Sequence, residues 1–109
     1  MLRMLKALAL FSVIALPQSA VAGAYTSAGV IWELNPREYG LDLTVPSAGN
    51  PVSCAWSGKF RLQQTAANYQ VIASVLITAA AQKKPVQLYA TSCDGDGATI
   101  IVAANVAVN

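Results

Sequence analysis

Apolar and polar side chains alternate in several short segments, with the two-residue period that is typical of a β-strand. Val30, Trp32 and Leu34 alternate with Ile31 and Glu33 in the first of these segments. We expect strands at residues 30–34, 41–45, 54–62, 86–90 and 99–108. Asn35-Pro36 is expected to end the first strand in a turn, and residues 46–51 and 91–97 are expected to be loops.

The period changes between residues 66 and 82, which contain no glycine or proline. Apolar residues there fall on one helical stripe, made of Tyr69, Ile72, Ala73, Leu76, Ala79 and Ala80. Thr65 is the expected N-cap, and Pro85 forbids continuation of the helix. Val71, Val75 and Ile77 lie off the stripe, so this helix is apolar around most of its circumference. We therefore expect it to be covered on more than one side, with these three residues facing another subunit.

The resulting order is β-β-β-α-β-β, which predicts a mainly β protein with one helix. It matches the OB-fold, a small five-stranded antiparallel barrel with its helix between the third and fourth strands. The alternative is an open antiparallel sheet with the helix on one face. In either case Trp32 and Phe60 are expected to fill the core.

Residues 1–22 have the organisation of a secretory signal peptide. Arg3 and Lys6 precede an apolar run at 7–16, and Ala20-Val21-Ala22 supplies a small-x-small cleavage pattern. Ten apolar residues are too few to span a membrane, which takes about 20. We expect a mature chain of residues 23–109 that forms a single domain, has no membrane span, and is secreted or periplasmic.

Cys54 and Cys93 are the only cysteines of the chain. Export places them in a compartment where disulfides persist, so we expect them to form one structural disulfide bond. A metal site would need more ligands, and a redox-active pair would be expected as Cys-x-x-Cys.

The amino-acid composition disfavours several kinds of partner and of catalytic site. Charged residues are 11% of the chain, and histidine is absent. Without Arg3 and Lys6, five cations face five anions, which does not favour a nucleic-acid partner. We expect no catalytic residues, no metal and no cofactor, and an enzyme is the least favoured alternative. Asp94-Gly95-Asp96-Gly97 resembles the opening of a calcium loop, but the rest of that pattern is missing, so a tight turn is expected.

Exposed aromatic side chains are the best candidates for ligand contact, because OB-folds that bind sugars or single strands present aromatics on one barrel face. Trp56 lies next to the proline- and glycine-rich loop, and Tyr39 and Tyr89 are expected to project outward. These three are the predicted binding residues.

Residues 68–79 (NYQVIASVLITA) and 83–89 (KKPVQLY) resemble the helix-to-strand segment of bacterial AB5-type toxin B subunits, of the subtilase-cytotoxin and pertussis-like kind. The shared features are a tyrosine opening the helix, an apolar run ending in Leu-x-Thr-Ala, a short basic turn and Pro-Val before a strand. The resemblance implies a secreted OB-fold subunit that assembles into a ring of five, binds cell-surface glycans and accompanies a secreted catalytic chain. It covers about a third of the chain, and no sugar-contacting residue of that family can be matched here.

Two functions therefore stand as the main alternatives. One is an oligomeric glycan-binding subunit, and the other is a monomeric periplasmic or secreted interaction module. The second alternative expects Ile77 to be covered by the protein's own sheet.

Overall fold

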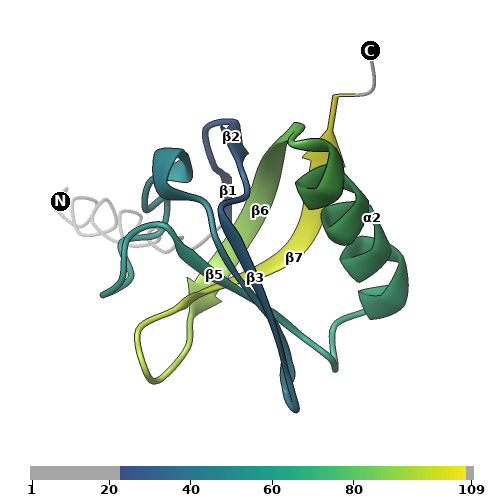
Figure 1. Cartoon of the computed structure of the whole chain (residues 1–109). Helices are drawn as coiled ribbons and strands as arrows, with labels where there is room; N and C mark the ends of the chain where they lie inside the picture. The colour runs from purple at the N-terminus through teal and green to yellow at the C-terminus, as the bar shows by residue number, and fades with distance from the viewer. Residues whose placement is uncertain (1–22, 108–109) are drawn as a thin grey trace, which may run out of the picture.

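The computed structural model describes residues 23–107, so the predicted signal peptide at 1–22 and the predicted strand position Val108 lie outside the described residues. The elements in chain order are β1 (Ala24–Tyr25), β2 (Gly29–Val30), β3 (Glu33–Arg37), β4 (Gly40–Thr44), the 3₁₀ turn η1 (Pro46–Ala48), β5 (Lys59–Gln63), α2 (Tyr69–Gln82), β6 (Pro85–Cys93) and β7 (Thr99–Val106). The protein is mainly β with one α-helix among the described residues, as predicted (Figure 1).

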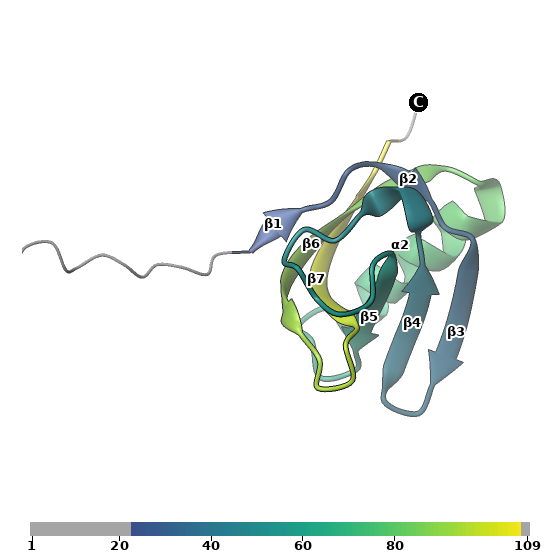
Figure 2. The same ribbon diagram turned by 90° about the vertical axis from the view of Figure 1, so that its left-hand side faces the viewer.

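The strands form one sheet in the order β1-β6-β7-β5-β4-β3, and β2 also pairs with β6. This sheet is mixed, which corrects the expectation that all strands are antiparallel: β5 and β7 run parallel, with Phe60 opposite Thr99 and Arg61 opposite Ile100. The sheet is strongly curved, and α2 lies along one side of it, next to β7 (Figures 1 and 2). No ladder joins β3 to β1 or β6 among residues 23–107, so the sheet is not closed.

Side chains from both halves of the sheet and from the helix share one core. The largest fully buried apolar side chains include those of Phe60, Leu43, Leu62, Leu88 and Ile101. From the helix, Leu76 and Ala79 are buried, and Tyr69, Ile72, Ala73 and Ala80 pack against them. The predicted helical stripe is thus the face that contacts the core.

The first predicted strand differs from the structure. It is split into β2 and β3, Pro36 lies inside β3, and the turn falls at Glu38 and Tyr39. Proline is tolerated because β3 is an edge strand and needs hydrogen bonds on one side only. The prediction that Trp32 fills the core is wrong: the chain bends between the two strands, which leaves Trp32 77% exposed and turns Ile31 inward.

Other boundaries also shift. The third strand begins at Lys59, because residues 54–58 belong to a loop. Strand β6 runs through Cys93, beyond the predicted start of the loop at residue 91. The pairing of β6 with β7 is irregular around Ala90. It interrupts the alternation of side chains along β7, where Ile101 is buried and Val102 is exposed.

The helix begins at Tyr69, three residues later than predicted, and Thr65 is not its N-cap. Asn68 occupies that position with φ 61° and ψ 28° and makes no side-chain cap hydrogen bond. Asparagine tolerates this left-handed conformation better than most residues, which explains why the helix starts here. At the other end the backbone N–H of Lys84 donates to the Ala79 carbonyl, before Pro85 opens β6.

Cys54 and Cys93 form a disulfide bond, as predicted, with their Cα atoms 5.4 Å apart. The bond joins the loop before β5 to the last residue of β6. Around it, the Trp56 N–H donates to the Gly97 carbonyl, and the Asn50 side chain closes the loop by two hydrogen bonds to the Cys54 backbone. Two loops distant in sequence are therefore held together at one end of the sheet.

Candidate functional site

Three large aliphatic side chains border the solvent-exposed side of α2, and the rest of the chain does not cover them. Val71 is 64% exposed, Ile77 52% and Val75 38%. At 3.6 residues per turn, Val71 and Val75 flank one border of the buried stripe and Ile77 the other. We call these three residues the outer helix face. They are the residues predicted to face another subunit, and within the single chain they are exposed to solvent.

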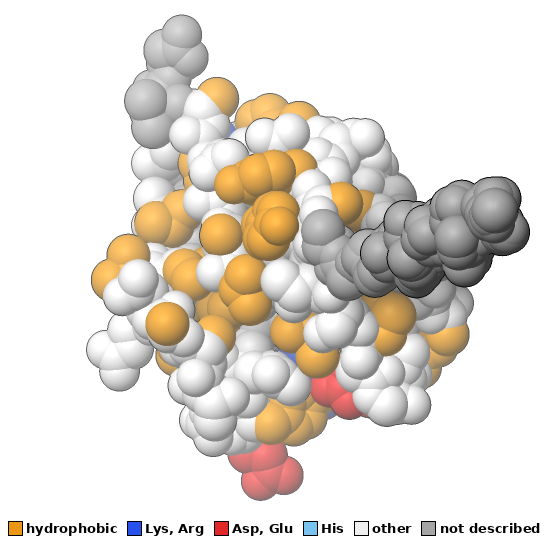
Figure 3. Space-filling model, turned by 180° about the vertical axis from the view of Figure 1, so that it is seen from behind, with side chains coloured by type: hydrophobic (Ala, Val, Ile, Leu, Met, Phe, Trp, Pro, Cys, Tyr) orange, Lys and Arg blue, Asp and Glu red, His pale blue; other side chains and the backbone are white. Residues whose placement is uncertain are grey.

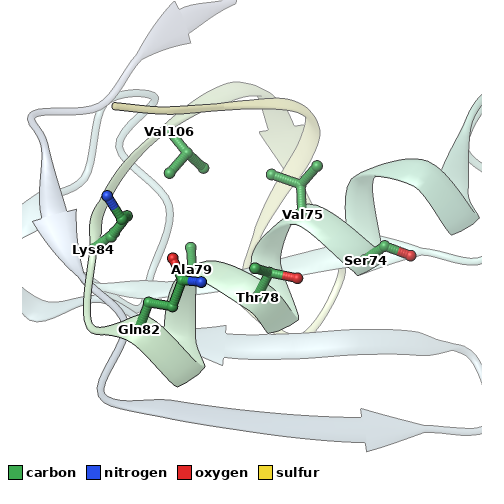
Figure 4. Close-up of a pocket in the computed structure, with 7 residues that line it drawn as sticks. All are labelled: Ser74, Val75, Thr78, Ala79, Gln82, Lys84 and Val106. Carbon is green, nitrogen blue, oxygen red and sulfur yellow. The ribbon is translucent and has the colours of Figure 1, made fainter. Parts of the chain in front are cut away.

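A groove of about 410 Å³ runs between α2 and the end of β7. Val75 and Val106 extend into it from opposite walls, and Lys84 lies at one end (Figure 4). The complete lining is Ser74, Val75, Thr78, Ala79, Gln82, Lys84 and Val106. Valine, alanine and threonine methyl groups make most of this surface apolar, and Lys84 is its one charged residue, so the groove suits an uncharged, apolar contact.

Apolar side chains are also exposed elsewhere on the surface. On the back of the molecule, apolar side chains are spread over much of the surface, and acidic side chains lie at its lower edge (Figure 3). No helix within residues 23–107 is long and apolar enough to cross a membrane. Exposed apolar surface of this kind is typical of a place where another molecule binds.

A second feature is an ion cluster around Arg61, which is only 7% exposed. Its guanidinium donates to Asp42 (Nε to Oδ1, 2.8 Å), Asp94 (2.9 Å) and Asp96 (3.1 Å). It also lies over the Tyr39 ring, with Cζ 4.5 Å from the centroid. Asp42 is the direct cross-strand neighbour of Arg61, whereas the other two aspartates come from the loop between β6 and β7.

The cluster shifts the pKa values of Arg61, Asp42 and Asp94 in the directions that stabilise their charged forms. The hydrogen bonds that Arg61 donates to Asp42 raise the pKa of Arg61 against the opposing effect of burial. Burial alone would raise the pKa of Asp42, but hydrogen bonds from Arg61 and Tyr39 lower it below its usual value. The hydrogen bond from Arg61 likewise lowers the pKa of Asp94.

All three carboxylates accept hydrogen bonds from Arg61, and this pairing limits the chemistry that the cluster can perform. General acid–base work needs a group that titrates near the operating pH, whereas Asp42 and Asp94 are driven further from it. The tight turn predicted for residues 94–97 is present, with the Gly97 N–H donating to the Asp94 carbonyl. We interpret the cluster as a structural clamp between β4, β5 and the β6–β7 loop.

The three predicted binding residues lie in different surroundings. Trp56 is 47% exposed and borders a hollow of about 130 Å³ that also includes Asn35, Arg37, Thr44 and Lys59. Tyr39 borders a neighbouring hollow, and Arg61 contributes to both. Tyr89 is half-buried and packs against Tyr25, with ring centroids 4.8 Å apart.

The backbone next to Trp56 depends on a glycine. Gly97 has φ 105°, and a Cβ atom there would lie 3.3 Å from the Trp56 ring and 3.0 Å from the Ala55 side chain. A larger residue would be strained by its backbone conformation and would press on the indole. Trp56 is thus positioned by the disulfide-linked loops.

Sequence reasoning missed two features of these surfaces. Alternation in the sequence puts Arg61 on the same side of its strand as Lys59, and it does not reveal the three aspartates that Arg61 contacts. The groove beside Val106 was missed because it depends on where the helix packs.

Comparisons with protein-family models, with curated proteins and with solved structures each gave no match.

Proposed function

We propose that this protein is an exported, non-catalytic binding protein that works as a homo-oligomer, and that the outer helix face and its groove form the contact between copies. The observation that carries this proposal is the exposure of Val71, Val75 and Ile77 on a helix whose remaining apolar stripe already packs against the core. Burying a fully exposed side chain of this size contributes about 1.5–3 kcal/mol, and each of these partly covered side chains would gain a corresponding fraction of it.

The monomeric alternative expects Ile77 to be covered by the protein's own sheet. Ile77 is instead 52% exposed, and α2 contacts the rest of the chain through the opposite stripe. This placement favours the oligomeric alternative. The disulfide supports export, because such bonds persist in oxidising compartments.

We also propose the finer fold description, a partly open OB-fold-like barrel. Its support is that β2 pairs with β6 at one end of the sheet while β3 pairs with β4 at the other. Only Ile31 and Trp32 separate these two short strands, so the chain itself connects the two ends.

The proposed ligand is a cell-surface glycan, as the toxin-B resemblance implies, and the accompanying secreted catalytic chain is part of the same proposal. Trp56 is the best-placed aromatic for a sugar, because its exposed ring adjoins amide, hydroxyl and cationic side chains around one hollow. These groups provide both a stacking surface and hydrogen-bonding partners.

Self-association is tested by adding one negative charge to the outer helix face. Val75→Asp and Ile77→Asp should each weaken association by about 10-fold or more while the chain stays folded, because each places a charge in an apolar contact. Light scattering across micromolar concentrations measures the mass, and circular dichroism checks folding. Ser57→Asp, which adds the same charge at an exposed polar position outside α2, should leave the mass unchanged. A wild-type chain that stays strictly monomeric would contradict the proposal.

Glycan binding is tested separately by a glycan-array screen followed by titration of the sugars found. Trp56→Ala should weaken binding by about 10- to 100-fold, since stacking on an aromatic ring contributes about 1–3 kcal/mol. Trp32→Ala is the matched control, because Trp32 is more exposed but lies outside the hollow. Equal losses in both variants, or an array without any bound sugar, would count against this site.

A further inference from the structure

Strand β7 is paired along its whole length on one side only. On that side it follows β6 from Thr99 to Val106. On the other side its ladder with β5 covers Thr99 and Ile100 alone. Over residues 101–106 this second side has no neighbouring strand within the described part of the chain, and we call it the open edge of β7.

Hydrogen bonds on β6 show which backbone groups face the open edge. The Leu88 carbonyl accepts from the Thr26 N–H, and the Leu88 N–H donates to the Thr26 hydroxyl, so both groups point away from β7. By alternation, Gln87 and Tyr89 face β7, where Asn105 and Ala103 are their register partners. The N–H and C=O groups of Ala104 and Val106 therefore face the open edge.

Strand β3, at the other edge of the sheet, is protected against pairing with further strands. Strand β3 carries Glu33, Pro36 and Arg37, and charges and proline are the usual means of preventing further pairing. The sequence of β7, TIIVAANV, contains no charge, no proline and no glycine. An edge left without such protection is suited to pairing with another strand.

The groove beside α2 continues this edge, since Val106 is both an edge residue and part of its wall. An added strand would cover the groove and part of the outer helix face. The same segment of a second copy fits best: it offers identical outward N–H and C=O groups at two-residue spacing and brings no charge to the contact. Residues 23–109 also carry five cations and five anions, so two copies do not repel by net charge.

We propose that two copies of this chain associate about a twofold axis by antiparallel pairing of their β7 open edges, which joins their sheets. This interface describes in more detail how the proposed homo-oligomer forms, so it depends on the self-association proposed above. It requires an even number of copies, whereas a ring of five does not use it.

Amide hydrogen exchange of the full mature chain tests this pairing residue by residue. The Ala104 and Val106 amides should exchange at least about 10-fold more slowly at a concentration where the oligomer dominates than after dilution to the monomer. Ala104→Pro removes one outward N–H without removing a bond to β6 and should yield a folded monomer. Val102→Lys, an exposed charge on the same strand, should do likewise without altering the backbone. Gln87→Lys, on the interior strand β6, should leave the mass unchanged.

The outcomes separate the two proposals. An oligomer with an odd number of copies, or one in which both amides exchange as fast as in the monomer, would overturn β7 pairing and leave self-association through α2 standing. A strict monomer at every concentration would overturn both.

Discussion

Replacing Cys54 and Cys93 together with serine is expected to lower the free energy of unfolding by about 4 kcal/mol. The bond closes a loop across a sequence separation of 39 residues, and the chain-entropy relation gives a value of this size for such a loop. A domain of this length has a total stability of only about 5–15 kcal/mol, so the loss is large. Urea unfolding of the oxidised wild type and of the double variant measures it.

Reduction of the wild-type protein is the control for the new hydroxyl groups. Cys54 is buried, so part of the loss in the serine variant comes from burying a polar group, and the reduced wild type lacks that contribution. Both should lose most of the same stability. If reduction changes the unfolding midpoint by less than the equivalent of about 1 kcal/mol, the bond does not stabilise the fold as described.

The core faces of the strands and of the helix were predicted correctly, because each depends on a local sequence pattern. Leu41, Leu43, Phe60 and Leu62 occupy alternating positions in neighbouring strands and are buried, and the helical stripe contacts them. These patterns are reliable because a one-residue change of register would expose a whole apolar face. The disulfide was predicted from the expected export of the chain and from the presence of a single pair of cysteines.

Features that depend on contacts between distant segments were not predictable. The parallel pairing of β5 with β7 has no signature in the local sequence of either strand. The irregular pairing near Ala90 changes which residues of β7 point inward. Trp32 was assigned to the core because it continued an alternation that the chain breaks at a bend. In each case the orientation of a residue or strand is set by a segment that lies far away in the sequence.

The Arg61 cluster is a feature that the alternation of residues did not predict. Removing it is expected to lower the free energy of unfolding by about 2–3 kcal/mol. Arg61→Met keeps the packing of the aliphatic stem but leaves Asp94 and Asp96 without their cation, and Asp42 with only the longer 3.7 Å contact to Arg37. Losing one partner of a fully buried pair typically costs about 3–5 kcal/mol; the aspartates here are partly exposed, which lowers the figure. Lys59→Met is the matched control on the same strand, and should change stability by less than about 0.5 kcal/mol because Lys59 is exposed.

The pH dependence of this loss distinguishes an ion cluster from simple packing. Asp42 and Asp94 have pKa values in the folded protein below those of the unfolded chain, so their contribution is fully present above about pH 4 and is lost as the pH falls through the folded values. The stability difference between wild type and Arg61→Met should therefore be constant from pH 7 to pH 5 and shrink below pH 4. Urea unfolding at each pH measures it. A difference that stays constant down to pH 2 would mean that the arginine stabilises the fold through its packing alone, since the protonated aspartates could no longer pair with it.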